Sequence, residues 1–194
     1  MATCVGIRLR RLGRRASTDD GFGLVELLIA MTMLSIAIGA LLAVFTSSAA
    51  SLRRAGEKGT ALTLADTQME KYRTRTFTAV RIDGSLIPTS GTYVTANATD
   101  STIPPSTNQA VSGQNGDEAC PTTDEPPACL PVQNVTGPDG HAYRIETYVN
   151  YVNNDSTLSI RTPASGLTLK LVTVVVRDAA TGSIMARESS AFSS

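Results

Sequence analysis

The chain of 194 residues has room for one ordinary globular domain and an appendage, so a single folded unit is the starting expectation. Its formal charge is balanced, with 17 Lys and Arg residues against 17 Asp and Glu residues, but residues 1–21 hold five of the arginines and only two aspartates. The rest of the chain is therefore mildly acidic, which argues against a general nucleic-acid binder.

An uncharged apolar run follows the basic leader at residues 27–52. As a helix, these 26 residues would rise about 39 Å, against roughly 30 Å of hydrocarbon in a bilayer. The run contains no proline and a single glycine, Gly39, so a continuous helix is expected. By the positive-inside rule, the arginines before the run place the N-terminus in the cytoplasm. We expect one membrane span at residues 22–46 and an extracytoplasmic remainder.

Two other kinds of N-terminal segment compete with this prediction. The small residues of SSAAS, 47–51, would suit a signal peptidase, but a secretory signal has an apolar core of only about 7–15 residues. An uncleaved anchor fits the length of the run but gives no reason for Glu26, the one charged residue between Gly21 and Arg53. A charged side chain costs about 2.5–3.5 kcal/mol at the centre of a span and less near its ends, and is usually retained for function.

The position of Glu26 relative to Phe22 suggests such a function. If the peptide bond between Gly21 and Phe22 were cut, the new α-amino group would lie about one helical turn from the Glu26 carboxylate. Each buried charge would then have an opposite partner, either in the same chain or in a neighbouring chain.

The stretch GFGLVELLIAMTML, residues 21–34, resembles the N-terminal signature of type IV prepilins and of the pseudopilins of type II secretion. Gly21, Phe22 and Glu26 match its glycine, its apolar first mature residue and its glutamate at the fifth mature position. The resemblance implies that a membrane-embedded prepilin peptidase cleaves after Gly21 on the cytoplasmic side and methylates the new N-terminus at Phe22. It also implies assembly through the apolar helix, with Glu26 accepting the N-terminal charge of a neighbour. Asp19 and Asp20 depart modestly from the basic leader that is common in the family.

The same resemblance implies the partners, which are prepilin peptidase, other pilin subunits and the inner-membrane assembly platform. The expected location is the bacterial cytoplasmic membrane, as a single-pass protein with its N-terminus in the cytoplasm, and afterwards an extracytoplasmic or cell-surface filament. A minor pilin is favoured over a major one, because the apolar helix lacks proline and the next helical segment has a short pattern of basic and acidic residues.

Residues 47–80 change to an amphipathic pattern, which predicts that the helix continues past the membrane. Gly56 and Gly59 are weak points in it, each costing about 1 kcal/mol relative to Ala. The apolar positions recur at steps of three to five residues: Leu62, Ala65, Met69, Tyr72, Phe77 and Val80. We expect this apolar stripe to pack on a sheet.

Residues 97–140, within an expected globular head at 81–194, hold seven of the nine prolines and predict an irregular loop. If this loop is extracytoplasmic, Cys120 and Cys129 are expected to form a disulfide. Two free thiols are the alternative, and a metal site that uses the single histidine, His141, is not expected. The acidic residues near the cysteines are expected to be solvated and not to bind calcium: Asp117, Glu118, Asp124 and Glu125.

Strand patterns begin after the proline-rich loop. Alternation of apolar and polar residues predicts a strand at residues 143–151, and short strands follow at 158–161 and 184–188. Residues 167–178 are apolar on both faces in their middle, as a central strand would be. The expected fold is α+β, with a long N-terminal helix packed on a small antiparallel sheet at residues 143–188. The pilin resemblance implies the same kind of head.

The chain shows neither a phosphate-binding Gly-rich loop with lysine nor a nucleophile elbow, and His141 has no evident partner. We therefore expect no enzymatic activity, no cofactor, no nucleic acid and no small-molecule substrate. The leading hypothesis is a structural subunit, either a minor pilin or a pseudopilin. The alternatives are a filament-tip module for binding or adhesion, and a single-span membrane protein with an unrelated extracytoplasmic domain.

Overall fold

The computed structural model describes residues 23–114, 120, 129–153, 158–161 and 166–194. The chain divides into two compact units, Met1–Ala49 and Ala50–Ser194. Helix α1 (Leu24–Arg73) begins in the first unit and ends in the second. The leader expected at residues 1–21 and the neighbouring Phe22 lie outside the described residues.

Helix α1 is rich in Ala and Leu, which have high helix propensity, and it contains no proline. Its hydroxyl side chains bond back to carbonyls one turn earlier, for example from Ser35 Oγ to the Met31 oxygen at 2.8 Å. The helix ends at Arg73, earlier than the predicted boundary at residue 80, and Phe77–Ala79 forms a separate 3₁₀ turn, η1. The three threonines of TRTFT explain this end, because β-branched side chains lose rotamer freedom in a helix.

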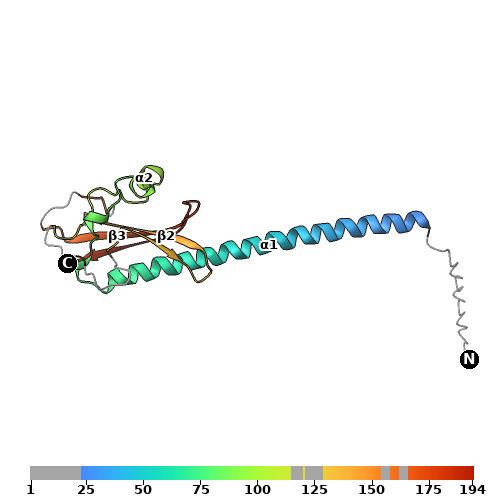
Figure 1. Ribbon diagram of the computed structural model, residues 1–194, viewed down its shortest axis with the longest axis horizontal. Coiled ribbons are helices and arrows are strands. Elements are labelled where there is room, and N and C mark those ends of the chain that lie inside the picture. The colour runs from blue at the N-terminus through green and yellow to red at the C-terminus, as the bar shows by residue number, and fades with distance from the viewer. Residues whose placement is uncertain (1–22, 115–119, 121–128, 154–157, 162–165) are drawn as a thin grey trace, which may run out of the picture. The chain divides into compact units, whose positions relative to one another are not determined.

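The second unit contains a four-stranded antiparallel sheet in the order β1-β2-β3-β4 (Figure 1). Its strands are β1 (Val132–Thr136), β2 (Ala142–Tyr151), β3 (Leu169–Asp178) and β4 (Ile184–Ser193). The long helix and this sheet confirm the α+β class. Three of the strands coincide with predicted segments, although β4 continues five residues beyond the predicted end at residue 188.

Two predictions about the head were wrong. Strand β1 and part of α2 (Thr92–Thr99) lie in the range 97–140, which was expected to be irregular. Residues 158–161, expected to form a returning strand, contribute only an isolated bridge between Val152 and Ile160. Strand β1 has five residues, of which three carry an amide or a hydroxyl group and two of these are adjacent, so its sequence shows no clear alternation.

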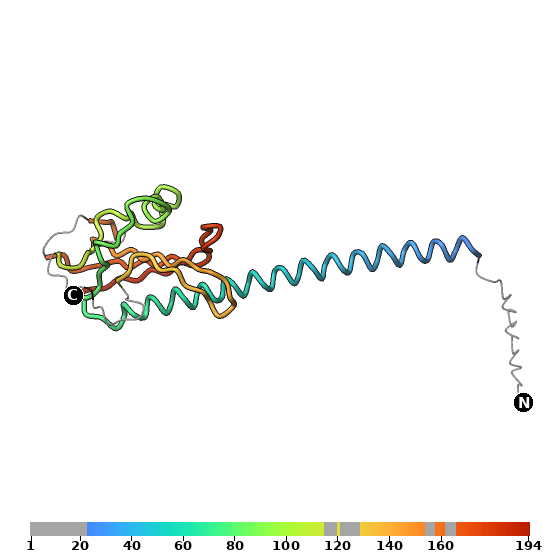
Figure 2. The backbone as a smooth tube through the Cα atoms, viewed as in Figure 1, coloured from blue at the N-terminus to red at the C-terminus, as the bar shows by residue number. Residues whose placement is uncertain are grey.

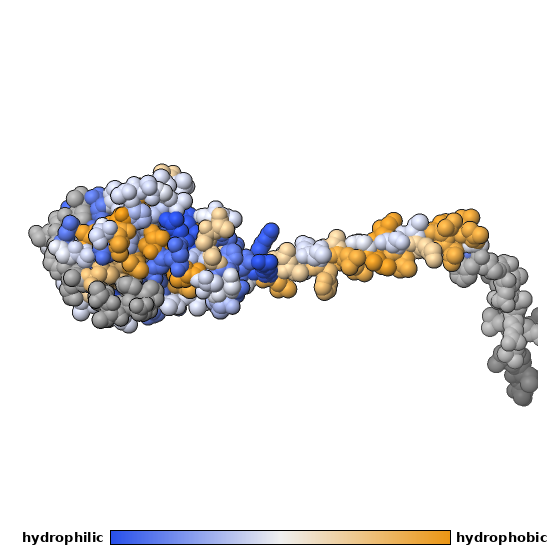
Figure 3. Space-filling view, viewed as in Figure 1, coloured by the Kyte–Doolittle hydropathy of each residue, from blue (hydrophilic) through white to orange (hydrophobic). Residues whose placement is uncertain are grey.

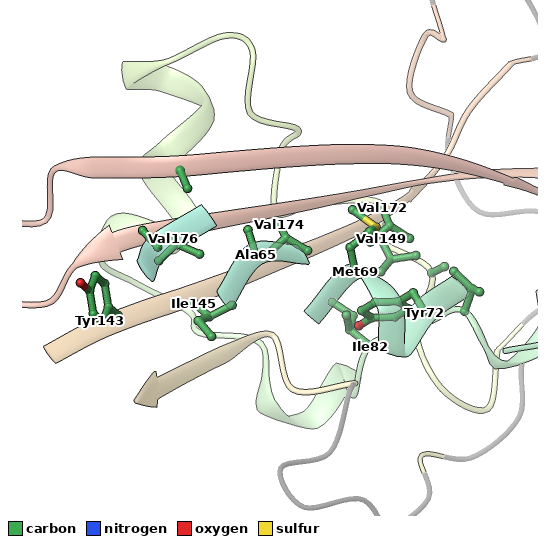
Figure 4. Packing of buried hydrophobic residues seen from close by; sticks show 14 of the residues in the cluster. Ala65, Met69, Tyr72, Ile82, Tyr143, Ile145, Val149, Val172, Val174 and Val176 are labelled. Atoms are coloured by element: carbon green, nitrogen blue, oxygen red, sulfur yellow. The ribbon is translucent and has the colours of Figure 1, made fainter. Parts of the chain in front are cut away.

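The second half of α1 packs on one face of the sheet (Figure 4). Ala65, Met69 and Tyr72 from the helix are essentially inaccessible to solvent. They contact alternate residues of the two central strands, namely Ile145, Val149, Val172, Val174 and Val176. This arrangement confirms the expected helix-on-sheet packing, but Leu62 of the predicted stripe is 57% exposed and Ala61 is buried in its place.

The opposite face of the sheet is covered by the short helix α2, so the second unit has three layers (Figure 1). The ring of Tyr93 from α2 stacks on Tyr148 of β2, with centroids 4.5 Å apart. Val175, which lies between the inward-facing Val174 and Val176 in sequence, belongs to this second cluster. The period of two along a strand therefore explains why the middle of β3 is apolar on both faces.

Candidate functional site

The described part of the first unit presents apolar side chains in every direction. All its residues from 23 to 49 are exposed within the chain, including Leu24 at 76%, Ile36 at 72% and Phe45 at 78%. Figure 3 shows this stretch of α1 as mostly hydrophobic on the face in view, with paler patches between the hydrophobic groups. By length and composition α1 can cross a membrane. An apolar surface of this size, which no residue in the described ranges covers, is typical of a helix that contacts lipid or other proteins.

Glu26 lies in the first turn of this helix. The turn is closed by the Glu26 and Leu27 amides, which donate to the Gly23 carbonyl oxygen at 2.9 and 3.2 Å. A carboxylate at this position interacts favourably with the positive end of the helix dipole. Glu26 makes no ion pair with any residue that the structure describes, so its charge is available to a group outside that set. Gly21 and Phe22, the two residues of the expected cleavage position, lie outside the described residues.

Cys120 and Cys129 lie at disulfide distance, with their Cα atoms 6.3 Å apart. Cys129 is buried, and its carbonyl oxygen accepts a hydrogen bond from the Asp83 amide at 2.8 Å. This backbone hydrogen bond joins the proline-rich segment to a part of the head that precedes α2 in the chain. Within the described ranges no group of three or more potential metal ligands occurs. The four acidic residues considered for calcium, at positions 117, 118, 124 and 125, lie outside those ranges.

His141, which had no evident partner in the sequence, contacts Asp178 at the start of the β3–β4 turn, with Nε2 and Oδ2 3.0 Å apart. The backbone amide of Thr181, then that of Ala180, and also His141 hold the pKa of the Asp178 carboxyl below its usual value. The two side chains meet because the register pairs Tyr143 with Asp178. The pair joins the β1–β2 turn to the β3–β4 turn and is structural. The sequence does not show the strand register, so it could not have predicted this pair.

The turn between β1 and β2 lies directly against α1 (Figure 2). The Tyr143 hydroxyl is 2.5 Å from Asp139 Oδ2 and 3.1 Å from the Glu57 carbonyl oxygen. Burial, helped by the Asp139 carboxylate, raises the pKa of Tyr143 to about 12. The same hydroxyl lowers the pKa of Asp139. These contacts attach the sheet to the helix a few residues after the apolar stretch ends.

Comparison with known protein families gives one match. Residues 17–42 match the model of the prokaryotic N-terminal methylation motif, and they include Gly21, Phe22 and Glu26. Comparison with curated proteins and with solved structures gives no match. The motif supports assignment to the type IV prepilin and pseudopilin family, and it implies processing by prepilin peptidase and assembly with other pilins. Together with the apolar helix it supports single-pass membrane anchoring, and it points to a structural protein.

Proposed function

We propose that the chain is a minor pilin or pseudopilin, a structural subunit of a type IV pilus or a type II secretion-like filament. Prepilin peptidase removes residues 1–21 by cutting between Gly21 and Phe22, and the new N-terminus at Phe22 is methylated. Residues 22–46 then form the membrane span and later the filament core, residues 47–80 continue the stem, and residues 81–194 form the extracytoplasmic head. One observation carries the proposal: the matched motif opens a helix whose apolar side chains, from residue 24 to residue 45, are covered by none of the residues that the structure describes.

The exposed apolar helix supports assembly through its physical cost. Leaving a Leu, Ile or Phe side chain in water instead of burying it costs about 1.5–3 kcal/mol. Eighteen large hydrophobic residues are exposed among the described residues, and fourteen of them lie between Leu24 and Phe45. The helix must therefore remain in an apolar environment, first in the bilayer and then among the helices of neighbouring subunits.

Glu26 supports assembly through its charge. A carboxylate that is buried without an opposite charge costs several kcal/mol, whereas a close partner offsets much of that cost. Cleavage at Gly21 creates such a partner, a positively charged α-amino group. In a staggered array of parallel helices, the amine of one subunit can meet the Glu26 carboxylate of the next.

Mass spectrometry of the N-terminus of membrane-extracted protein from the native host tests the proposal. The expected species begins at Phe22 and carries one extra methyl group on its amine. A Gly21→Val variant, which places a branched side chain at the cleavage position, should retain residues 1–21. A wild-type protein that keeps its original Met1 end would overturn the proposed processing.

A second experiment tests the role of Glu26. The Glu26→Ala variant should insert and be cleaved as the wild type is, yet it should be depleted from sheared filament fractions. Val25→Ala is the matched control, because it truncates the adjacent exposed side chain without removing a charge. Normal incorporation of Glu26→Ala would contradict the charge-pairing account while leaving the processing result intact.

A further inference from the structure

A cavity of about 500 Å³ lies between the beginning of α1 in the second unit and the β3–β4 turn. Arg54 and Lys58, which are one helical turn apart, line it on the helix side. Thr181 and Ser183 line it from the turn, and their hydroxyl groups lie 2.9 Å apart. The exposed side chain of Ile184 adds an apolar part to the wall. The cavity thus combines two positive charges, two hydroxyl groups and a small apolar surface.

The carboxylates that line the cavity are already engaged. Glu57 pairs with Arg53, at 3.0 Å between Oε1 and Nε. Asp178 accepts hydrogen bonds from the Ala180 and Thr181 amides through Oδ1, each at 2.8 Å, and contacts a histidine through Oδ2. In the described part of the chain, by contrast, Arg54 and Lys58 form no ion pair. Two cations without a local counterion beside hydroxyl donors form a site that suits an anion.

The position of these residues along the chain indicates which anion is near. Arg54 comes two residues after Leu52, the last residue of the uncharged apolar run, so it lies where the chain leaves the apolar segment. A bilayer is roughly 30 Å thick in its hydrocarbon and about 40–45 Å thick with its headgroups. When the apolar run spans a membrane, Arg54 directly follows the spanning segment and therefore lies at the headgroup level of the outer leaflet.

We propose that this cavity binds the phosphate of an anionic phospholipid in the outer leaflet of the membrane that holds the chain before assembly. The proposal rests on the membrane anchoring contained in the proposed function. Arg54 and Lys58 bind the phosphate, the hydrogen-bonded hydroxyl pair of Thr181 and Ser183 donates its remaining proton to a phosphate oxygen, and Ile184 contacts the glycerol and the first methylenes. Entry into a filament would then require release of the lipid.

Binding of phosphatidylglycerol to the full chain in neutral detergent micelles tests the proposal, with native mass spectrometry to measure the bound lipid. Replacing both cations, Arg54→Gln with Lys58→Gln, should weaken binding roughly 25-fold, because each charge near an anionic lipid contributes about a factor of five. Both side chains are exposed, and Gln is a good helix former, so the fold should tolerate the change. Phosphatidylcholine should bind poorly to both proteins.

The matched control removes two positive charges elsewhere in the second unit, Arg75→Gln with Arg161→Gln, and should bind phosphatidylglycerol as the wild type does. Equal binding by the Arg54, Lys58 double variant and the wild type would overturn the proposal. Displacement of the lipid by equimolar inorganic phosphate would overturn its assignment to a phospholipid. If the double variant binds the lipid as the wild type does but enters filaments less, the cavity is a contact site for a second copy of the chain and not a lipid site.

These outcomes separate the lipid site from the proposed function. Membrane fractionation of the wild-type chain reports the anchoring, and the mass of the N-terminus reports the processing. A chain that is anchored and cleaved, but whose double variant keeps full affinity for phosphatidylglycerol, would refute the lipid site alone.

Discussion

Two glycine-to-alanine substitutions, at Gly137 and Gly59, should change the stability of the head in opposite directions. A Cβ atom at Gly137 would lie 2.6 Å from Asp139 Oδ1, 2.7 Å from Tyr143 Cε2 and 3.0 Å from Thr60 Cγ2. These distances are too short, so a neighbouring group must move. At Gly59, inside α1, an added Cβ would meet no atom within 4 Å.

The structure gives the size of the expected loss at Gly137. Asp139 cannot swing away without losing the hydrogen bonds that it accepts from the His141 amide, at 3.0 Å, and from the Tyr143 hydroxyl. Overpacking of a well-packed site costs about 1–3 kcal/mol, and any loss of these hydrogen bonds adds to that cost. Gly137→Ala should therefore lower the free energy of unfolding by about 1.5–3 kcal/mol. Gly59→Ala should raise it by about 0.5–1 kcal/mol, because alanine loses less conformational entropy in a helix.

Thermal unfolding of the full chain in detergent micelles measures both changes. The protein has five tyrosines and no tryptophan, so near-ultraviolet circular dichroism of tyrosine is the probe of the head. At about 3 °C per kcal/mol for a unit of this size, Gly137→Ala should lower the midpoint by roughly 4–9 °C and Gly59→Ala should raise it by roughly 1–3 °C. If Gly137→Ala melts at or above the wild-type temperature, the β1–β2 turn does not pack on α1 as the structure describes.

Three further changes test other parts of the head. Burial raises the pKa of Tyr143 to about 12, so the hydroxyl loses its proton at a lower pH in the unfolded chain than in the folded one. The free energy of unfolding should therefore fall as the pH rises from about 10 to 12. In thermal melts at several pH values, a Tyr143→Phe variant should show a weaker dependence on pH. Glu146 is fully buried beside Arg177, at 2.8 Å, and Glu146→Ala should cost about 3–5 kcal/mol in denaturant titrations, part of which an added Arg177→Met should restore. Replacing Cys120 and Cys129 with serine should cost about 2.5–3 kcal/mol, and a wild-type protein whose stability is unaffected by a thiol reductant would refute that expectation.

The parts of the molecule that were predictable from sequence are those set by short-range pattern. The apolar run and Glu26 indicated both the long helix and the N-terminal motif, because charge, length and residue type are read along the chain itself. Strand β3 was predictable because its apolar residues continue through both faces. The stripe on α1 was predicted for the same reason, with an error of one residue at Leu62 that reflects the drift of a 3.6-residue period.

The parts that were missed depend on contacts between distant residues. Helix α2 has eight residues, of which three are threonine, and its propensity alone does not favour a helix; the stacking of Tyr93 on Tyr148 holds it on the sheet. The strand register brings the β1–β2 turn and the β3–β4 turn to the same end of the sheet. His141 meets Asp178 there, and the β3–β4 turn forms one wall of the cavity beside Arg54. Arg54 falls in the segment with an amphipathic pattern, and nothing along α1 itself indicates the opposite wall of the cavity.

Helix α1 has two kinds of surface, and the difference bears on how a subunit could leave the membrane. Between residues 61 and 72 its buried side chains are covered by the protein's own sheet, so the core of the head is complete within one chain. Between residues 24 and 49 no residue that the structure describes covers the side chains. Lipid tails are about as apolar as leucine, so moving this stretch from a bilayer to a bundle of similar helices gains little free energy from apolar burial. On the proposed function, the contacts that differ between the two environments are those of charged groups, chiefly Glu26 with a neighbouring amine, and they would determine the direction of transfer.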